Sequence, residues 1–311
     1  MKRRLSMAMS LALALGIGLT ACAGSKRRTS QYDLALYLQG QGKADEAMQA
    51  LQRSLALDPD DPTPREALAQ AYDKKGWRTQ AVEAWEQTVQ RSSDDPNYYS
   101  SAGKPTRSQA WIGDAVDSHK RAVAGLVRCY LETADAAFKG ARFDDAAKAA
   151  KRVTELDVDN ATAWPLLAKS DKKLKDNEGA YAAWKRCADL APKDADTFKE
   201  LGFAAFALTK LDEAETAFKR YISLAPADPK GYNNQGTVLA LLNRFAESQA
   251  SFDRALAIQH DMVAALNGKA TAYYYQKKYD AARKLWAHVL ELSPDDPTAT
   301  ENIATLTKMG Y

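Results

Sequence analysis

Small, bulky and helix-breaking residues return along this chain with a period of 34 residues. Prolines mark one phase of the period, at Pro59, Pro192, Pro226 and Pro294. Full blocks begin at Arg28, Pro62, Val127, Ala161, Ala195, Pro229 and Val263, and a partial block begins at Pro297. A fixed period of this length is the signature of a repeat protein, in which each block is one supersecondary unit that stacks on the next.

Three positions within each block hold residues of constant size. Position 8 is Ala or Gly, at Ala35, Ala69, Ala134, Ala168, Gly202, Gly236, Ala270 and Ala304. Position 20 is Ala or Ser, at Ala47, Ala81, Ala146, Ala180, Ala214, Ser248 and Ala282. Position 24 is bulky at Leu51, Trp85, Trp184, Phe218, Phe252 and Trp286, and only Ala150 departs from the rule. Small residues at two sites let a pair of antiparallel helices, A and B, approach closely, and the bulky residue fills the space beside that contact.

This pattern resembles the tetratricopeptide repeat (TPR), whose sequence reads W…L-G…Y…A…F…A…P, and position 4 adds aromatic residues at Tyr130, Trp164, Phe198 and Tyr232. The resemblance covers residues 28–93 and 127–311. It implies an all-α, right-handed superhelix of about seven helix-turn-helix repeats, with repeats one and two over 28–93, repeats three to seven over 127–296 and a capping helix over 297–311. Departures are local: Ser93, Val158 and His260 replace the terminal proline, and Asp171 replaces an aromatic or aliphatic residue at position 11.

An insertion over residues 94–126 interrupts the count between repeats two and three. Its first half is rich in turn-forming residues and predicts a loop. Apolar residues then return at helical spacing, at Trp111, Ile112, Ala115, Val116, Ala122, Val123 and Leu126. This run is in phase with helix A of repeat three, so we expect one long helix ending near Phe138. A long insertion in a solenoid is often specific for a partner, but a packing spacer or a degenerate repeat fits equally well.

The N-terminus has the layout of an export signal. Basic residues at 2–4 precede an uncharged, apolar run from Leu5 to Ala21, which is short and diluted for a membrane span. Leu19-Thr20-Ala21-Cys22 resembles the bacterial lipobox. That resemblance implies a lipoprotein signal peptide over 1–21, lipidation of Cys22 and a short linker over 22–27. An ordinary signal peptide with an incidental cysteine and an uncleaved anchor are the alternatives. Ala23 follows in place of the aspartate that retains lipoproteins at the inner membrane, which favours an outer membrane facing the periplasm.

Charge and cysteine content narrow the possible partners. Lys and Arg number 43 against 40 Asp and Glu, and three of the cations lie in the signal. A balanced mature chain lacks the basic footprint of a nucleic-acid-binding protein. The register places Cys129 against repeat two and Cys187 toward repeat five, so we expect two free, partly buried thiols and no disulfide.

The motifs of catalysis and of cofactor binding are absent from the sequence. His119, His260 and His288 are isolated, and no H-E-x-x-H, C-x-x-C or G-x-S-x-G occurs. The repeats leave no room for a catalytic domain. We therefore expect neither an enzyme nor a bound metal or cofactor.

The TPR resemblance implies an inner groove lined by positions 2, 5, 9, 12 and 13 of helix A. In repeats five to seven these positions predict a partner-binding strip made of Lys199, Phe203, Phe206, Lys230, Asn233, Thr237, Asn267, Thr271, Tyr274 and Tyr275. Amides that bond a peptide backbone, next to rings that stack on its side chains, suit an extended or helical peptide. Repeat four presents a basic patch of Lys169, Lys172 and Lys173, which could hold acidic side chains or form an ordinary solvated helix face. The carboxylate clamp of co-chaperone TPR domains is not reproduced.

These features together predict a membrane-anchored periplasmic TPR scaffold that binds a protein or peptide partner of the cell envelope. Its layout is similar to that of TPR lipoproteins that assist pilus assembly, the pilotins among them. The alternative function is a regulatory cofactor of a cell-wall (peptidoglycan) enzyme. We expect no nucleic acid and no small-molecule substrate.

Overall fold

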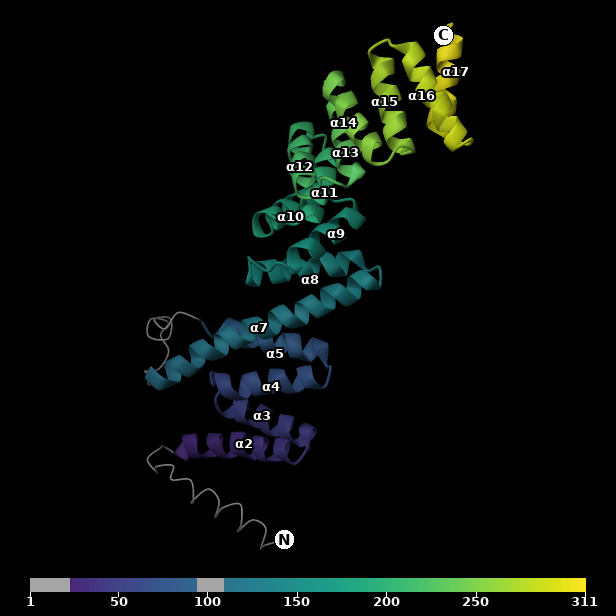
Figure 1. The fold of residues 1–311 in the computed structure, drawn as a ribbon. Helices are drawn as coiled ribbons and strands as arrows, with labels where there is room; N and C mark the ends of the chain where they lie inside the picture. Colours follow the sequence, from purple (N-terminus) through teal and green to yellow (C-terminus); the bar gives the residue numbers. More distant parts are fainter. Residues whose placement is uncertain (1–22, 94–108) are drawn as a thin grey trace. The chain divides into compact units, whose positions relative to one another are not determined.

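The computed structural model describes residues 23–93 and 109–311, and these residues form fifteen α-helices and no strand (Figure 1). The expectation of an all-α stack of helix-turn-helix repeats is confirmed. The chain divides into two compact units, Met1–Cys129 and Tyr130–Tyr311, and each is described by itself.

Unit 1 holds two helical hairpins and the first part of a long helix. Its helices are α2 (Ala23–Gly40), α3 (Ala44–Leu57), α4 (Pro62–Lys74), α5 (Arg78–Arg91) and the portion of α7 (Gln109–Lys139) up to Cys129. Repeat one is thus α2 and α3, and repeat two is α4 and α5. The packed side chains of repeat one include Met48 and Leu51.

Helix α2 begins earlier than the sequence predicts. It starts at Ala23, so the residues expected to form a linker before a repeat beginning at Arg28 are helical instead. Lys26, Arg27 and Arg28 are good helix formers and extend the helix before the predicted boundary, although Gly24 in its first turn is a weak one. The predicted signal peptide, the lipobox and Cys22 lie outside the described residues.

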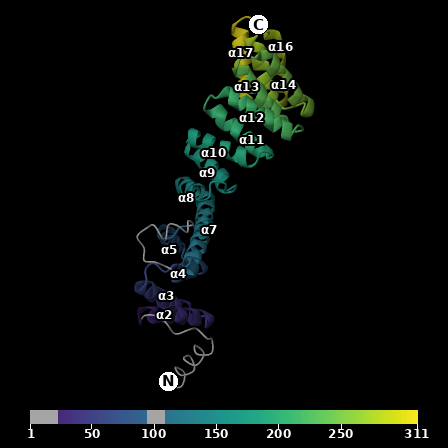
Figure 2. The same cartoon turned by 90° about the vertical axis from the view of Figure 1, so that its left-hand side faces the viewer.

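Unit 2 contains the C-terminal part of α7 and ten further helices. They are α8 (Phe143–Leu156), α9 (Ala163–Leu174), α10 (Asn177–Leu190), α11 (Ala195–Ala207), α12 (Leu211–Leu224), α13 (Pro229–Leu241), α14 (Phe245–Ile258), α15 (Val263–Tyr275), α16 (Tyr279–Leu292) and α17 (Pro297–Lys308). Within this unit the helices follow one another in chain order (Figure 1 and Figure 2). Helix A of repeats four to seven is α9, α11, α13 and α15, and α17 is the final helix.

Polar caps explain where the A helices begin. Asp61, Asp194, Asp228 and Asp296 each accept a hydrogen bond from a backbone N–H in the first turn of α4, α11, α13 and α17. Such caps satisfy N–H groups that have no partner inside the helix. Repeat four differs, because Asn160 Oδ1 accepts from the backbone N of Thr162 and Ala163. Helix α9 accordingly starts at Ala163, two residues after the predicted block boundary.

The turn between helices A and B places the same repeat position in the left-handed region in every block. In repeats one and two that residue is Gly42 and Gly76, which adopt positive φ readily. In repeats three to seven it is a non-glycine residue: Ala141 (φ 57°), Lys175 (63°), Thr209 (59°), Asn243 (59°) and Lys277 (60°). Packing of the two helices therefore fixes the turn even where the residue disfavours it.

The seam between helices A and B is built as predicted. Position 8 residues such as Ala168 and Ala270 are fully buried, as are position 20 residues such as Ala214 and Ala282. The bulky residue at position 24 fills the remaining space, so that a Cβ added to Gly202 would lie 2.6 Å from Phe218 Cε1. Ala304 alone is exposed at position 8, because no helix B follows α17.

Helix α7 is the long helix that the sequence predicts, and it ends one residue after Phe138. In unit 1 its apolar face is buried, including Ile112, Val116 and Leu126. Arg121 holds α7 to α4 through two hydrogen bonds to Glu66, of 2.7 Å from Nε and 3.0 Å from Nη2. The described part of the insertion thus packs as a helix of the repeat stack. The predicted loop lies outside the described residues.

The two described cysteines lie where the register places them, but they are fully buried rather than partly buried. The Sγ of Cys129 lies 3.8 Å from Arg78 Nη1 and 3.8 Å from Asp73 Oδ1, both in repeat two. Cys187 packs with Leu201 and Ala204 of repeat five. Both thiols are free.

Candidate functional site

The candidate site is the helix A face of unit 2, the side of α9, α11, α13 and α15 that carries repeat positions 2, 5, 9, 12 and 13. All ten residues of the predicted strip lie on α11, α13 and α15. They differ in exposure and in the contacts they already make.

The phenylalanines of repeat five are surface residues. Phe203 is 38% exposed and Phe206 is 37% exposed, although both lie on a helix whose other face is buried. The Phe203 ring makes an edge-to-face contact with buried Phe218, with a centroid distance of 5.5 Å. Lys172 Nζ lies 5.8 Å from the centroid of the Phe203 ring. A ring that is held by packing on one side and exposed on the other can contact a protein partner.

Several polar side chains of the strip in repeats six and seven already make hydrogen bonds within the protein. Thr237 and Thr271 each donate from Oγ1 to the backbone oxygen four residues earlier, at Asn233 (3.0 Å) and Asn267 (2.9 Å). Asn267 Nδ2 also donates to Asp296 Oδ1 at 3.2 Å. These side chains order the helix A face as well as lining it, while Lys230 is exposed.

The two tyrosines of repeat seven have different environments. Tyr274 belongs to the packing of the C-terminal repeat, with ring centroids 5.6 Å from Tyr279 and 6.1 Å from Trp286. Tyr275 is 63% exposed and stacks on Phe245 at 6.2 Å with an interplanar angle of 14°. Of this pair, Tyr275 is the ring available to a partner.

A pocket of about 520 Å³ opens on the same face between repeats three and five. It is lined by Phe138, Pro165, Lys169, Lys172, Lys173, Trp184, Asp194, Asp196, Thr197, Lys199 and Glu200. The lining includes the whole predicted basic patch of repeat four together with Lys199 of the predicted strip. The site therefore begins one repeat earlier than the sequence strip suggests.

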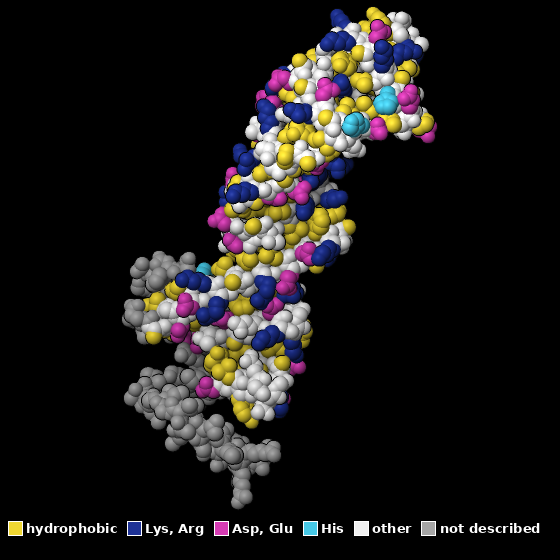
Figure 3. Space-filling model, in the orientation of Figure 1, with side chains coloured by type: hydrophobic (Ala, Val, Ile, Leu, Met, Phe, Trp, Pro, Cys, Tyr) yellow, Lys and Arg dark blue, Asp and Glu magenta, His cyan; other side chains and the backbone are white. Residues whose placement is uncertain are grey.

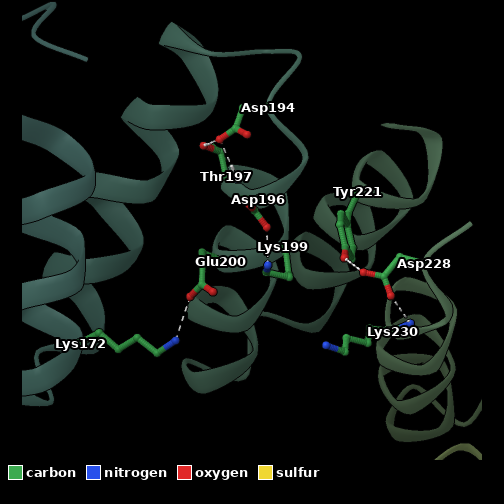
Figure 4. A network of polar contacts seen from close by, with 9 residues as sticks. All are labelled: Lys172, Asp194, Asp196, Thr197, Lys199, Glu200, Tyr221, Asp228 and Lys230. Atoms are coloured by element: carbon green, nitrogen blue, oxygen red, sulfur yellow. Dashed lines mark hydrogen bonds and ion pairs between the residues drawn. The ribbon is translucent and has the colours of Figure 1, made fainter. Parts of the chain in front are cut away.

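Acidic residues of α11 face the lysines across this pocket (Figure 4). Lys172 Nζ lies 2.8 Å from Glu200 Oε2, and Lys199 pairs with Asp196 one helical turn away. The hydrogen bond to Asp196 raises the pKa of Lys199, so this lysine stays protonated. Asp194 is committed to its own helix, since its Oδ2 accepts from the backbone N of Thr197 at 3.1 Å.

A second polar pair adjoins the pocket in repeats five and six. Tyr221 donates its hydroxyl proton to Asp228, the cap of α13 (Figure 4). Burial and this bond raise the pKa of Tyr221. Burial is the largest single influence on Asp228 and opposes its ionisation. The bonds from Tyr221 and from the backbone N of Lys230, with the charges of Lys230 and Lys199, together outweigh it and lower the pKa of Asp228. The pair links the end of repeat five to the start of repeat six.

Sequence reasoning missed the acidic side of the pocket. Glu200 lies 28 residues after Lys172, so this pair could have been found by testing charges across adjacent repeats. Asp196 lies three residues before Lys199, so that pair could have been found from the spacing of charges along one helix. Phe138 and Pro165 occupy positions 12 and 5 of helix A, which the register itself assigns to the inner face.

The surface and composition of the described residues add three further findings. Lys, Arg, Asp and Glu side chains are interspersed over the face shown in Figure 3. No helix among residues 23–93 and 109–311 is long and apolar enough to span a bilayer. Within the same residues, no cluster of three His, Cys, Asp or Glu side chains could hold a metal ion.

Comparison with protein families decides the nature of the repeats. Three tetratricopeptide repeat models match residues 38–104, 199–264 and 263–296. This chain belongs to the TPR family. A comparison with curated proteins finds no match.

Solved structures show the same fold at low sequence identity. The TPR chain superimposes on the crystal structure of MamA with a TM-score of 0.51 and 22% identity, over 54% of this chain and 92% of MamA. YrrB, a TPR protein with an unusual peptide-binding site, matches with a TM-score of 0.52 and 17% identity, over 61% of this chain and 95% of YrrB. MamA from Desulfovibrio magneticus RS-1 matches at 0.51 and 12% identity, over 55% and 97%.

Proposed function

We propose that this TPR protein is an interaction scaffold that holds a protein partner along the helix A face of unit 2. The observation that carries the proposal is the set of open side chains on successive A helices, from the pocket through Phe203 and Phe206 to Tyr275. A surface of exposed rings set among polar groups is typical of protein interfaces. YrrB, which has the same fold, is a TPR protein with an unusual peptide-binding site.

The exposed rings are large enough to contribute most of the binding energy. A phenylalanine buries about 200 Å² when fully covered. Covering the exposed third of such a ring contributes about 2 kcal/mol, at about 25 cal/mol per Å². Two or three such anchors near the centre of an interface are typical binding hot spots. Tyr274 contributes to folding instead, because its ring already packs against Tyr279 and Trp286.

Replacement of the open rings tests this proposal. Phe206→Ala combined with Tyr275→Ala should abolish capture of envelope partners in a crosslinking pulldown from membranes, while helical circular dichroism stays unchanged. Tyr37→Ala is the matched control, since Tyr37 is as exposed as Tyr275 but lies on α2 in unit 1. Undiminished capture by the double variant would overturn the assignment of the face.

We further propose that a lipid on Cys22 anchors the scaffold in the cell envelope, facing the periplasm. The support is the lipobox-like Leu19-Thr20-Ala21-Cys22 behind a basic and then apolar segment. Two or three acyl chains would make the attachment lasting. Radiolabelled fatty acid should label the natural chain and not Cys22→Ser, and labelling of the variant would contradict the lipoprotein assignment.

Assistance to a pilus or secretion complex is the function that we propose for the anchored scaffold. It rests on the layout of the chain, a lipobox followed by TPR repeats. Mass spectrometry of the crosslinked partners tests it directly. Recovery of a secretin or pilus component supports this function, and recovery of a peptidoglycan synthase or hydrolase instead would favour the cell-wall alternative.

A further inference from the structure

The pocket of repeats three to five has an apolar base and a rim of charged side chains. Phe138, Pro165 and Trp184 supply apolar surface, and Trp184 is almost fully buried. Lysines of α9 form one side of the rim and acidic residues of α11 form the other. This pocket is open to solvent, and its volume of about 520 Å³ is within the size range of ligand-binding sites.

The charges on this rim do not cancel. Lys172 and Lys199 are paired with Glu200 and Asp196, and Asp194 is occupied as the cap of α11. The two remaining lysines, Lys169 and Lys173, are exposed and make no ion pair with any residue that the structure describes. Lys173 Nζ lies 5.9 Å from the centroid of the Phe143 ring, and the side chain is exposed to solvent.

We propose that this pocket binds an acidic segment of the protein partner, with Asp or Glu side chains contacting Lys169 and Lys173 and an apolar side chain resting on the base. The inference deepens the proposed function, on which it rests, by naming the chemistry of the partner. An incoming carboxylate gains two cations without displacing any acid of the pocket. Lys172 could supply a third contact, because its side chain is exposed and its ammonium can pair with the incoming carboxylate as well as with Glu200.

The rim favours side-chain carboxylates over a cationic or neutral segment for a simple electrostatic reason. A cationic segment would be repelled by Lys169 and Lys173. A neutral amide would gain no ionic attraction from these lysines. The ammonium–carboxylate attraction is stronger beside an apolar base than in bulk solvent, because the effective dielectric constant is lower there. Attraction between partly exposed charges also weakens with salt, which gives the proposal a signature that apolar contacts lack.

The test uses the full chain and a fluorescein-labelled peptide, Ac-EDLEDLED, followed by anisotropy. An amide analogue, Ac-QNLQNLQN, has the same apolar residues and no side-chain charge. We expect the acidic peptide to bind at least tenfold more tightly than the analogue and to weaken at least fivefold between 50 and 300 mM NaCl. Equal affinity for the two peptides would overturn the proposal.

Substitutions locate the binding. Lys169→Ala with Lys173→Ala should weaken the acidic peptide at least tenfold, whereas Lys185→Ala, which removes an exposed lysine of α10 in the same repeat, should leave affinity unchanged. The reversed pair Lys169→Glu and Lys173→Glu should bind a basic peptide, Ac-KRLKRLKR, in its place. Unchanged acidic-peptide affinity in the alanine pair, or loss of equal size in the Lys185 control, would contradict the site.

Failure of this inference is distinguishable from failure of the proposed function. If the Phe206 and Tyr275 variant loses partner capture while the Lys169 and Lys173 variant retains it, the scaffold stands and the acidic pocket is wrong. If neither variant affects capture, the helix A face itself is not the binding surface.

Discussion

Asp171 is a buried carboxyl in the seam between helices A and B of repeat four, and it should destabilise the protein at neutral pH. Asp171 is 8% exposed, and the same repeat position, 11, holds Leu239 in repeat six and Tyr273 in repeat seven. A Cβ on Gly179 would lie 2.8 Å from Asp171 Oδ2, so the carboxylate rests against the first turn of α10. Burial, and then the nearby charge of Asp176, raise the pKa of Asp171 to about 6, while Lys151 opposes the shift.

The sign of the effect follows from this raised pKa. In the unfolded chain an aspartate ionises near pH 4, so between about pH 4 and pH 6 the folded state binds more protons than the unfolded state. Stability is therefore full below pH 4 and falls as pH rises toward 6. A shift of about two pKa units corresponds to about 3 kcal/mol. Because water still reaches the edge of this seam, we expect about 1–2 kcal/mol of destabilisation above pH 6.

Replacement of the carboxyl by an amide of the same shape measures this penalty. Asp171→Asn should raise the free energy of unfolding by about 1–2 kcal/mol at pH 8, and by far less at pH 4, where the buried side chain is neutral in both folded proteins. Urea unfolding followed by circular dichroism at the two pH values gives both numbers. Asp261→Asn, in an exposed turn of the same unit, is the control for the chemical change. An equal effect of Asp171→Asn at both pH values, or a loss of stability at pH 8, would refute the reasoning.

Three further predictions concern the turns, the seam and the thiols. Thr209→Gly should stabilise the protein by about 0.5–1 kcal/mol in urea unfolding, because a β-branched residue is strained at φ 59° and glycine is not; a loss of stability would contradict this account of the turn. Gly268→Ala should lower the free energy of unfolding by about 1–3 kcal/mol, since the added Cβ would lie 2.5 Å from Cε1 of fully buried Phe252; a neutral result would mean that the ring moves freely. Burial raises the pKa of Cys187 to about 12, so iodoacetamide at pH 8 should modify it only after denaturation, as read by mass spectrometry; rapid modification of the native protein would show that the contact between repeats four and five opens.

The fold was predictable because the period of 34 residues constrains size at positions that contact each other. Ala214 and Phe218 are buried in the structure for the same reason that they stood out in the sequence: two helices can approach only where one side chain is small and its neighbour fills the gap. The start of α2 was less predictable. The helix continues back to Ala23 through Gly24 and Ser25, which are weak helix formers, so composition does not predict where it begins.

The candidate site was predictable only in part. Register assigns residues to a face, and it placed Phe203, Phe206 and Tyr275 correctly on the surface. It could not show that Tyr274 packs against Tyr279 and Trp286, because those rings come from α16. The pocket could not be predicted from single repeats either, because ion pairs such as Lys172–Glu200 form between repeats.

The residue with positive φ in every A–B turn helps to set the fold, and it lies outside the helix A face that is proposed to bind the partner. Chain reversal and helix spacing are set in every repeat by the turn and the seam, whatever side chains stand on the helix A face. On the proposed function, a change at Lys169 or Phe206 alters what is recognised without altering how the repeat folds. Selection can revise the binding surface one repeat at a time, and a duplicated 34-residue block would enter the stack with its packing already complete. New binding specificities can therefore arise in this protein without a change of fold.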